Sequence, residues 1–517
     1  SPPAVEVPEA QESTIPVGGP NVALSTKEVQ PELSQGEPLP EETRYQISGK
    51  RFDVEFSALG GAVTKLSLKS WSKTQNGDIV LINRGQGEAG AFLTNLTGQG
   101  VDFNSRVFSL ERLDQVKGEV QFTSEEPGKW RLTKTYQLNE DKPTLSLEVE
   151  IENLGSSQQI APLEVTTQLD IDTHFKDSKL HAESFVSLPE KLLAEHLNKI
   201  EKKPYVVEGK IAWQALTRKY FAVILSPEEP AVLAKTTAAA KEVEFMTSAL
   251  QWKSAEVAPG HVLKQTFLIY AGPQYYRDLK SYGYGFEQIL SHGFFGPFRL
   301  WLLIGLQWVY KIVGNYGWAI VLVTFALKLL FAPLTHMSFD SMKRMQALQP
   351  KIKALQEHYK NDQAKLSKET MELYKKHKVN PMGGCLPMVL QIPIFIAFYQ
   401  LLAQTAELKG APFIFWVKDL SEADRAWTLP FSLPFLGDAV NILPLLMLGS
   451  MVWQQRLTPQ TSTADQQKMM MFMPIIFGFI FYSLPSGLVL YWFVNNMLSI
   501  FHQLFIKGKA LPHLTTD

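Results

Sequence analysis

The sequence predicts an α+β membrane protein in which a large extracytoplasmic β-sandwich precedes a five-helix transmembrane bundle with a cytoplasmic helical hairpin. Residues 45–272 alternate apolar and polar side chains with a period of two, which is typical of half-buried strands. The chain after about Phe294 is mostly apolar and aromatic. Within it, residues 316–335 are long enough to cross a bilayer, yet they carry Lys328 near their centre.

Composition limits the possible classes of protein. The chain of 517 residues is long enough for more than one domain. Its net charge of -1 averages a polar first half and an apolar second half, and no basic surface runs through the polar half, so direct binding of nucleic acid is not expected. A single cysteine, Cys385, excludes an internal disulfide. The chain opens on Ser1 without a signal-peptide pattern, so we expect an upstream segment that directs the first domain across the membrane.

The first half divides into a linker and a strand-rich domain. Residues 1–44 are rich in Pro, Glu, Gln and Ser, a composition that favours a disordered linker. Residues 45–272 then predict the β-sandwich, with the clearest alternation at residues 145–151. One helical interval is expected at about residues 189–202. Sandwiches of this size can bind carbohydrate, but no carboxylate pair or aromatic platform stands out, so a scaffold role is favoured.

Residues 273–315 form the predicted connector to the membrane. They are aromatic and rich in glycine, as suits a membrane interface. Within the connector, residues 298–313 predict an amphipathic helix in the outer interface, because Arg299, Gln307 and Lys311 share one helical face. The alternative is a sixth membrane span.

The second half predicts five spans joined by polar segments. A lysine-rich segment, residues 336–380, follows the first span and predicts a cytoplasmic helical hairpin, because cytoplasmic loops carry an excess of Lys and Arg. The carboxyl-terminal tail, residues 510–517, is then also cytoplasmic. Two spans are short enough to suggest a locally thinned bilayer. The spans lie at about residues 316–335, 383–405, 440–454, 469–484 and 488–506.

The hairpin carries a set of basic residues that could dock a ribosome or targeting factors. Its apolar seam is predicted by residues that step by three and four: Met345, Leu348, Ile352, Leu355 and Tyr359. A solvated coiled coil without a partner is the alternative. The basic residues assigned to docking are Lys343, Arg344, Lys351, Lys353, Lys375 and Lys376.

Lys328 is the residue of the spans that most needs an explanation. A lysine at the centre of an inserting helix costs roughly 2.5–3.5 kcal/mol. No carboxylate lies inside a span to pair with it. We therefore expect a water-filled recess that opens to the cytoplasm and not to the outside. The alternative is that the lysine stem extends along the helix toward Thr335, about 10 Å away.

Other polar side chains within the spans are also costly if they face lipid. We assign Lys328 and five of these side chains to a substrate groove: Thr324, Gln391, Asn495, Asn496 and Gln503. A recess open on one side is suited to receiving a polar segment that must cross while its apolar part slides into lipid. The hypothesis that competes with this insertion function is a small-solute transporter or channel, although no inverted repeat is evident among the spans.

Enzyme signals are weak in this sequence. It has no P-loop, no HExxH motif and no Cys/His cluster with metal-ligand spacing, so neither a cofactor nor a metal is expected. Ser486 and His502 could suggest a hydrolytic pair, but on one helix they lie about 24 Å apart. We therefore expect no enzymatic activity.

Four stretches resemble the YidC/Oxa/Alb family of membrane protein insertases. The likeness covers most of the chain after Tyr45, and these membrane motifs are specific in combination. They are VTFALKLLFAPLT (323–335), MQALQPKIKALQE (345–357), VNPMGGCLPMVLQIPIFIAFY (379–399) and FMPIIFGFIFYSLPSGLVLYW (472–492).

The resemblance implies an inner-membrane, multi-pass protein with a periplasmic sandwich and a cytoplasmic carboxyl terminus. It implies nascent membrane proteins, Sec translocon components and membrane lipid as partners, and a further amino-terminal span. The family usually has arginine at the position of Lys328, so the charge is kept here and the planar fork is lost. Its substrate-contacting tyrosine falls on Trp492, beside Tyr491, and both residues join the predicted groove.

Overall fold

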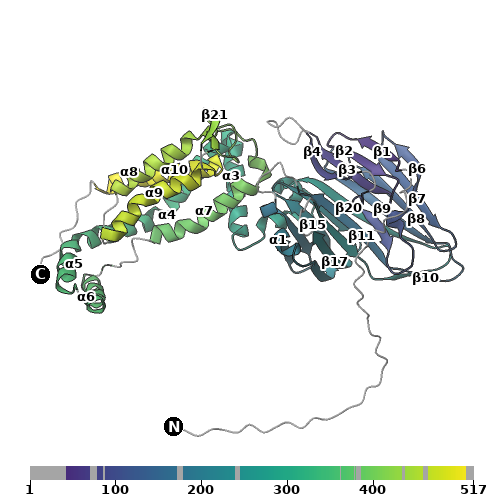
Figure 1. The fold of residues 1–517 in the computed structure, drawn as a ribbon, viewed down its shortest axis with the longest axis horizontal. Helices are drawn as coiled ribbons and strands as arrows, with labels where there is room; N and C mark the ends of the chain where they lie inside the picture. Colours follow the sequence, from purple (N-terminus) through teal and green to yellow (C-terminus); the bar gives the residue numbers. More distant parts are fainter. Residues whose placement is uncertain are drawn as a thin grey trace, which may run out of the picture. The chain divides into compact units, whose positions relative to one another are not determined.

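The structure is a computed structural model. Strands fill the chain up to Pro273 and helices form most of the remainder (Figure 1). The predicted linker as far as residue 41, Cys385 and the tail from residue 508 lie outside the described residues. The described residues are 42–69, 78–85, 88–171, 179–238, 245–360, 362–377, 379, 386–433, 437–457 and 464–507.

Three antiparallel sheets form the first domain (Figure 1). The largest sheet has the order β13 (Leu192–His196), β12 (Glu183–Ser187), β15 (Trp213–Arg218), β16 (Phe221–Pro227), β20 (Val262–Pro273), β9 (Thr144–Asn153), β8 (Trp130–Leu138), β7 (Glu119–Glu126) and β6 (Ser109–Asp114). The second has the order β14 (Tyr205–Ile211), β17 (Ala231–Ala238), β18 (Phe245–Gln251), β11 (Leu163–Asp170) and β5 (Leu93–Leu96). The third has the order β1 (Arg44–Ser48), β2 (Phe52–Ser57), β3 (Ala62–Leu68) and β4 (Ile79–Asn83). A small pair, β10 (Gln159–Ala161) and β19 (Ala255–Val257), lies beside them.

The three sheets share one hydrophobic core. Phe56 of β2, Leu147 of β9 and Val165 of β11 are all fully buried in it. Along β9 the buried and partly exposed positions alternate, because successive side chains of a strand point to opposite faces. The sheets therefore pack around a common interior, and the predicted large β-domain is confirmed.

The helical interval predicted at residues 189–202 is wrong for most of its length. Residues Leu192–His196 form β13, which pairs along its whole length with β12, and only Leu197–Ile200 form a helix, α1. The edge of β12 offers this segment backbone hydrogen-bond partners, and such tertiary context overrides local helix propensity.

The connector contains α2 (Tyr276–Ser281), a 3₁₀ turn η3 (Phe286–Ser291) and α3 (Gly296–Val313). Helix α3 covers the helix predicted at residues 298–313. Its polar Gln307 is buried, whereas Trp301 and Trp308 are exposed. Of the polar residues, Arg299 and Gln307 therefore face the protein, whereas Lys311 is exposed, and the tryptophans face outward.

Helices dominate the chain after the connector. They are α4 (Tyr316–Ala347), α5 (Gln349–His358), α6 (Gln363–Lys376), α7 (Leu386–Gln404), α8 (Ile442–Leu457), α9 (Ala464–Tyr482) and α10 (Ser486–Lys507), with a hairpin of β21 (Trp427–Leu433) and β22 (Gly437–Val440). Among the described residues, Tyr316–Ala347 and Ser486–Phe505 are long and apolar enough to cross a membrane, and Gln391–Gln404 and Phe472–Tyr482 are shorter apolar helices. A helical region after the β-domain is thus confirmed.

Helix α4 does not end where the first predicted span ends. It continues past Thr335 to Ala347, so Lys343 and Arg344 lie on α4 itself. Ser338, Met342 and Met345 remain buried along this extension, and their spacing of three and four continues one packed face. Because this face remains packed beyond Thr335, the helix continues past the predicted end of the span.

Residues 405–424, here called the cap loop, follow α7 and contact the first turns of three helices. The Asn315 side chain, which caps α4, donates from Nδ2 to Phe413 O at 3.0 Å. The Asp424 carboxylate accepts the backbone N–H of Leu443 in α8, at 2.5 Å. Ser486, the first residue of α10, donates from Oγ to Asp419 O at 2.8 Å. The starts of α4, α8 and α10 and the end of α7 therefore lie at the same end of the helical region.

Gly317 in the first turn of α4 should not tolerate a side chain. A Cβ there would lie 2.0 Å from the ring of Phe413, so Gly317→Ala requires the cap loop to move. Overpacking of this kind typically costs about 1–3 kcal/mol. We expect a lower melting temperature in detergent than for Gly449→Ala, the control in α8, where a Cβ meets nothing within 4 Å. Equal melting temperatures for the two variants would contradict this packing.

Candidate functional site

Lys328 of α4 reaches across to α10. Its Nζ donates to Ser499 Oγ at 2.7 Å and to Asn495 Oδ1 at 3.3 Å. The two partners are four residues apart and therefore share one face of α10. The Ser499 hydroxyl donates in turn to Asn495 O at 2.7 Å, which leaves its oxygen to accept from the ammonium. The partly buried cation is thus bound by neutral oxygens of a second helix.

The position of the ammonium tests the alternative that the lysine stem extends along α4 toward Thr335. Lys328 lies about 18 Å of helix rise from the start of α4 at Tyr316, and Ser499 lies about 20 Å from the start of α10 at Ser486. Both helices start at the cap loop, so the two residues are at the same depth. The side chain therefore extends sideways to α10 and not along α4 toward Thr335.

Asn496 turns to another neighbour. Consecutive helical residues point about 100° apart, and Asn496 Nδ2 accordingly donates to Ser450 Oγ of α8 at 3.1 Å. Ser450 donates onward to Met447 O at 2.6 Å. Two adjacent asparagines thus connect α10 to α4 and to α8, and both connections are polar.

The other predicted groove residues lie around the same helices. Thr324 donates to Ile320 O of its own helix at 2.6 Å. Gln391 of α7 is hydrogen-bonded to the hydroxyl of Tyr491, whose ring stacks on Phe398 with centroids 4.5 Å apart. Hydrogen bonds between side chains place five of the eight predicted residues in three separate pairs and not in one cluster. The pairs are Lys328 with Asn495, Asn496 with Ser450 of α8, and Gln391 with Tyr491.

Trp492 and Gln503 are the last two of the predicted groove residues. Trp492 packs against the rings of Phe395, Phe477 and Phe481, with centroids 5.1–5.9 Å apart. Gln503 is buried on α10, two turns beyond Asn496. Sequence reasoning missed Ser499 as a partner of Lys328. Its spacing of four from Asn495 was the available signal, because that spacing places a second acceptor on the same helical face.

The basic residues of the hairpin are mostly exposed. Arg344, Lys351 and Lys353 are exposed, as are Lys375 and Lys376, whereas Lys343 is partly buried. Beneath them, Met345, Leu348, Ile352 and Val379 form a small separate core, with Leu373 and Tyr374 packed against it. The predicted apolar seam is confirmed at Met345, Leu348 and Ile352, whereas Leu355 and Tyr359 are only partly buried and are not part of this core. The cations remain at the surface.

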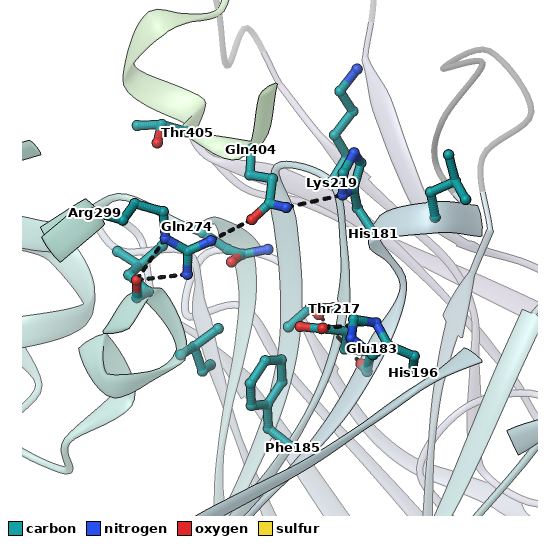
Figure 2. A pocket seen from close by; sticks show the side chains of 13 residues that line it. His181, Glu183, Phe185, His196, Thr217, Lys219, Gln274, Arg299, Gln404 and Thr405 are labelled. Carbon is teal, nitrogen blue, oxygen red and sulfur yellow. Dashed lines mark hydrogen bonds and ion pairs between the residues drawn. The ribbon is translucent and has the colours of Figure 1, made fainter. Parts of the chain in front are cut away.

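A polar junction joins the end of α7 to the β-domain and to α3 (Figure 2). Arg299 of α3 donates from Nη2 to Leu290 O at 2.7 Å and from Nη1 to the Gln404 side chain. Gln404 is also hydrogen-bonded to His181 Nδ1 of the β-domain, at 3.0 Å. These residues line a cavity of about 60 Å³, together with Glu183 and His196, which pair at 2.9 Å.

Glu407 forms the second half of this junction. Its Oε1 accepts the backbone N–H of Tyr276 at 3.0 Å and Gln307 Nε2 at 3.1 Å. Burial raises the pKa of this carboxyl to about 7, because it disfavours the charged form. Gln404 at the end of α7 and Glu407 in the cap loop therefore bind the β-domain and the connector, respectively.

Comparison with known proteins identifies the family. Residues 44–304 match the family described as YidC periplasmic domain, and residues 308–512 match the family described as 60Kd inner membrane protein. The chain is 35% identical over 465 residues to the membrane protein insertase YidC of Geobacter sp. (strain M21), which covers 88% of this chain and 84% of that protein. The chain belongs to the YidC insertase family.

Other members and a solved structure are also similar. The YidC insertase of Geobacter metallireducens (strain ATCC 53774 / DSM 7210 / GS-15) is 32% identical over 514 residues, covering 97% of this chain and 90% of that protein. A crystal structure titled as an active YidC insertase with its first transmembrane domain resolved covers 91% of this chain and 94% of that chain, with 18% identity and a TM-score of 0.40.

Family membership settles several expectations at once. This chain is a membrane protein insertase of the inner membrane with a periplasmic domain, its substrates are nascent membrane proteins, and it is not an enzyme. The transporter alternative is therefore rejected. The periplasmic domain also orients the helices, since Gln404 and Glu407 contact His181 and Tyr276 of that domain. The end of α7 and the cap loop consequently lie on the periplasmic side.

Glu407 should make stability depend on pH. Its folded-state pKa of about 7 lies above the ordinary value of 4.5, so the folded protein binds the extra proton. The resulting stabilisation is full below pH 4.5 and is lost as the pH rises through 7, on the order of 3 kcal/mol in total. We expect the melting temperature to fall between pH 5 and 8.

Glu407→Gln should flatten this pH profile while keeping the acceptor oxygen for Tyr276 and Gln307. Glu190→Gln, at an exposed position, is the control and should leave the wild-type profile unchanged. A Glu407→Gln profile as steep as that of the wild type would assign the pH dependence to another group.

Proposed function

We propose that this insertase moves the hydrophilic segments of nascent membrane proteins through a groove between α4 and α10 that is open to the cytoplasm and to lipid. The observation that carries the proposal is the contact of Lys328 with Asn495 and Ser499 inside the helical region. A cation held among neutral polar groups, and paired with no carboxylate in the part of the chain that the structure describes, can attract an acidic client segment.

The attraction between Lys328 and a client carboxylate is comparable in size to the cost of placing that carboxylate in the bilayer. An acidic client residue about 4 Å from the ammonium would gain about 4 kcal/mol at the effective dielectric constant found near protein surfaces. Placing an aspartate at the bilayer centre costs roughly 2.5–3.5 kcal/mol. The attraction therefore offsets the cost of one crossing carboxylate, and no nucleotide hydrolysis is needed. Thr324, Gln391, Asn496, Tyr491, Trp492 and Gln503 would line the remainder of the route.

The proposed division of the chain follows from this route. Residues 45–272 would form the periplasmic domain, residues 273–315 the connector, and residues 316–509 the insertase core with five crossing helices: α4, α7, α8, α9 and α10. Helix α8 has 16 residues and spans about 24 Å, which is less than a hydrocarbon core of about 30 Å. The bilayer around the bundle would therefore be thinned, which shortens the distance that a hydrophilic segment must cross.

The proposed partners fit the two ends of the molecule. The exposed cations of α5 and α6 support docking of a ribosome or targeting factors on the cytoplasmic side. The outward aromatic face of α3 supports contact with lipid in the outer interface, where Trp side chains are favoured. We further propose that the insertase acts alone or together with Sec translocon components.

The charge at position 328 should decide how acidic clients are handled. We expect Lys328→Arg to keep insertion, and Lys328→Ala and Lys328→Glu to slow insertion of a client with an acidic translocated segment by at least about tenfold, the effect of losing about 1.4 kcal/mol. Insertion into proteoliposomes, read by protease protection, measures the rate. The exposed Lys418→Glu is the control for added negative charge. Equal rates for all Lys328 variants would remove this cation from the mechanism.

Water should reach Ser499 from one side only. In a Cys385→Ser background, Ser499→Cys places a thiol beside the Lys328 ammonium, which favours the reactive thiolate. A membrane-impermeant thiol reagent should label it from the cytoplasmic side and leave it unlabelled from the periplasmic side. Labelling from the periplasmic side, or from neither, would contradict a groove with a single opening.

A further inference from the structure

The cap loop contains a buried ion cluster that the groove does not use. Lys409 is almost completely buried, with 2% of its side chain exposed, and its Nζ lies 3.4 Å from Asp419 Oδ2 and forms an ion pair with Glu422. Asp419 Oδ1 also accepts the backbone N–H and the hydroxyl of Ser421, at 2.8 and 2.7 Å. One ammonium therefore brings together two carboxylates that come from a single turn of the loop.

The part of the loop that Lys409 holds forms the cap of α10. The first N–H groups of a helix have no partner within the helix and usually bind side chains or water. Here the backbone N–H of Ser486 donates to Glu422 O at 2.6 Å, and that of Gly487 donates to Leu420 O at 2.9 Å. The Ser486 hydroxyl adds its bond to Asp419 O. Three carbonyls of this turn, those of Asp419, Leu420 and Glu422, thus anchor the start of the helix that carries Asn495 and Ser499.

The packing at this point is tight. A Cβ on Gly487 would lie 3.0 Å from Leu420 O and 2.9 Å from the Leu402 side chain. Ala423 and Pro485 also form an antiparallel bridge. Together with the contacts to Asn315 and Leu443, the loop covers the periplasmic starts of α4, α8 and α10. A route between α4 and α10 that opened to the periplasm would have to displace this loop.

We propose that Lys409 is a positioning residue that keeps the cap loop closed over the periplasmic end of α4 and α10. Without its charge, Asp419 and Glu422 would repel each other across a short turn, and Asp419, whose carboxylate is the less exposed of the two, would lose its ion pair. The turn would then open, and the carbonyls of Asp419, Leu420 and Glu422 would leave the first turn of α10. This proposal depends on the proposed function in one respect: it assumes that a water-filled groove lies between α4 and α10 beneath the loop.

Lys409→Met tests the closure, because it keeps the stem and removes the charge. In the Ser499→Cys, Cys385→Ser protein reconstituted in proteoliposomes, we expect periplasmic-side thiol labelling to rise several-fold. Lys418→Met, on the same loop but exposed, is the matched control and should leave labelling at background. Lys409→Arg should restore the closed state. Background labelling in a folded Lys409→Met protein, or an equal rise in Lys418→Met, would overturn the proposal.

Hydrogen–deuterium exchange separates this inference from the groove itself. We expect Lys409→Met to accelerate exchange several-fold in peptides covering residues 409–424 and 486–490, and to leave the periplasmic domain unchanged. Exchange that rises evenly over the whole chain would reduce Lys409 to a general stabilising residue and overturn the proposal. If Lys409→Met does not fold, Lys409→Gln, which also removes the positive charge between the two carboxylates but keeps a polar end, takes its place with the same expected changes. A parent protein that no reagent labels from either side would refute the groove, while the exchange result still decides the closure.

Discussion

The contact between the Lys328 ammonium and the face of α10 is the interaction on which the helical region depends. Burying a cation among apolar helices is costly, and the cost is tolerable only if other elements supply oxygens. Asn495 and Ser499 supply them from a helix that begins at the same end of the bundle. The need to satisfy one charge thus fixes which helix lies beside α4, and at what depth.

The two ends of the helical region are built on different principles. At the periplasmic end, backbone carbonyls of the cap loop and the side chains of Gln404 and Glu407 satisfy helix starts and tie them to the periplasmic domain. At the other end, α4 continues into a separate small core formed by Met345, Leu348 and Ile352. The basic side chains around this core are mostly exposed to solvent. The two ends of the helical region therefore differ: a loop caps the helix starts at one end, and basic side chains are exposed at the other.

Much of this architecture was predictable from the sequence, and the misses share a cause. The alternation at residues 145–151 and the apolar seam of the hairpin were interpreted correctly, because each pattern is local. The segment Leu192–His196 was assigned to a helix because its strand partner lies elsewhere in the chain. The contacts of Arg299 and Gln307 in α3 could not be predicted either. Their partners, Gln404 and Glu407, are about a hundred residues away in the chain.

The sequence by itself determined that a strand-rich domain precedes apolar helices, that a lysine lies within the first of them, and that the motifs are those of an insertase family. These are properties of periodicity, length and composition, which neighbouring residues carry without reference to the rest of the chain. Only the tertiary structure decided which polar groups meet. Lys328 and Ser499 are 171 residues apart, and Lys409 meets Glu422, 13 residues further on, only because the cap loop folds into a turn. Hydrogen bonds and ion pairs act over a few ångströms, so their partners are set by packing and not by sequence order.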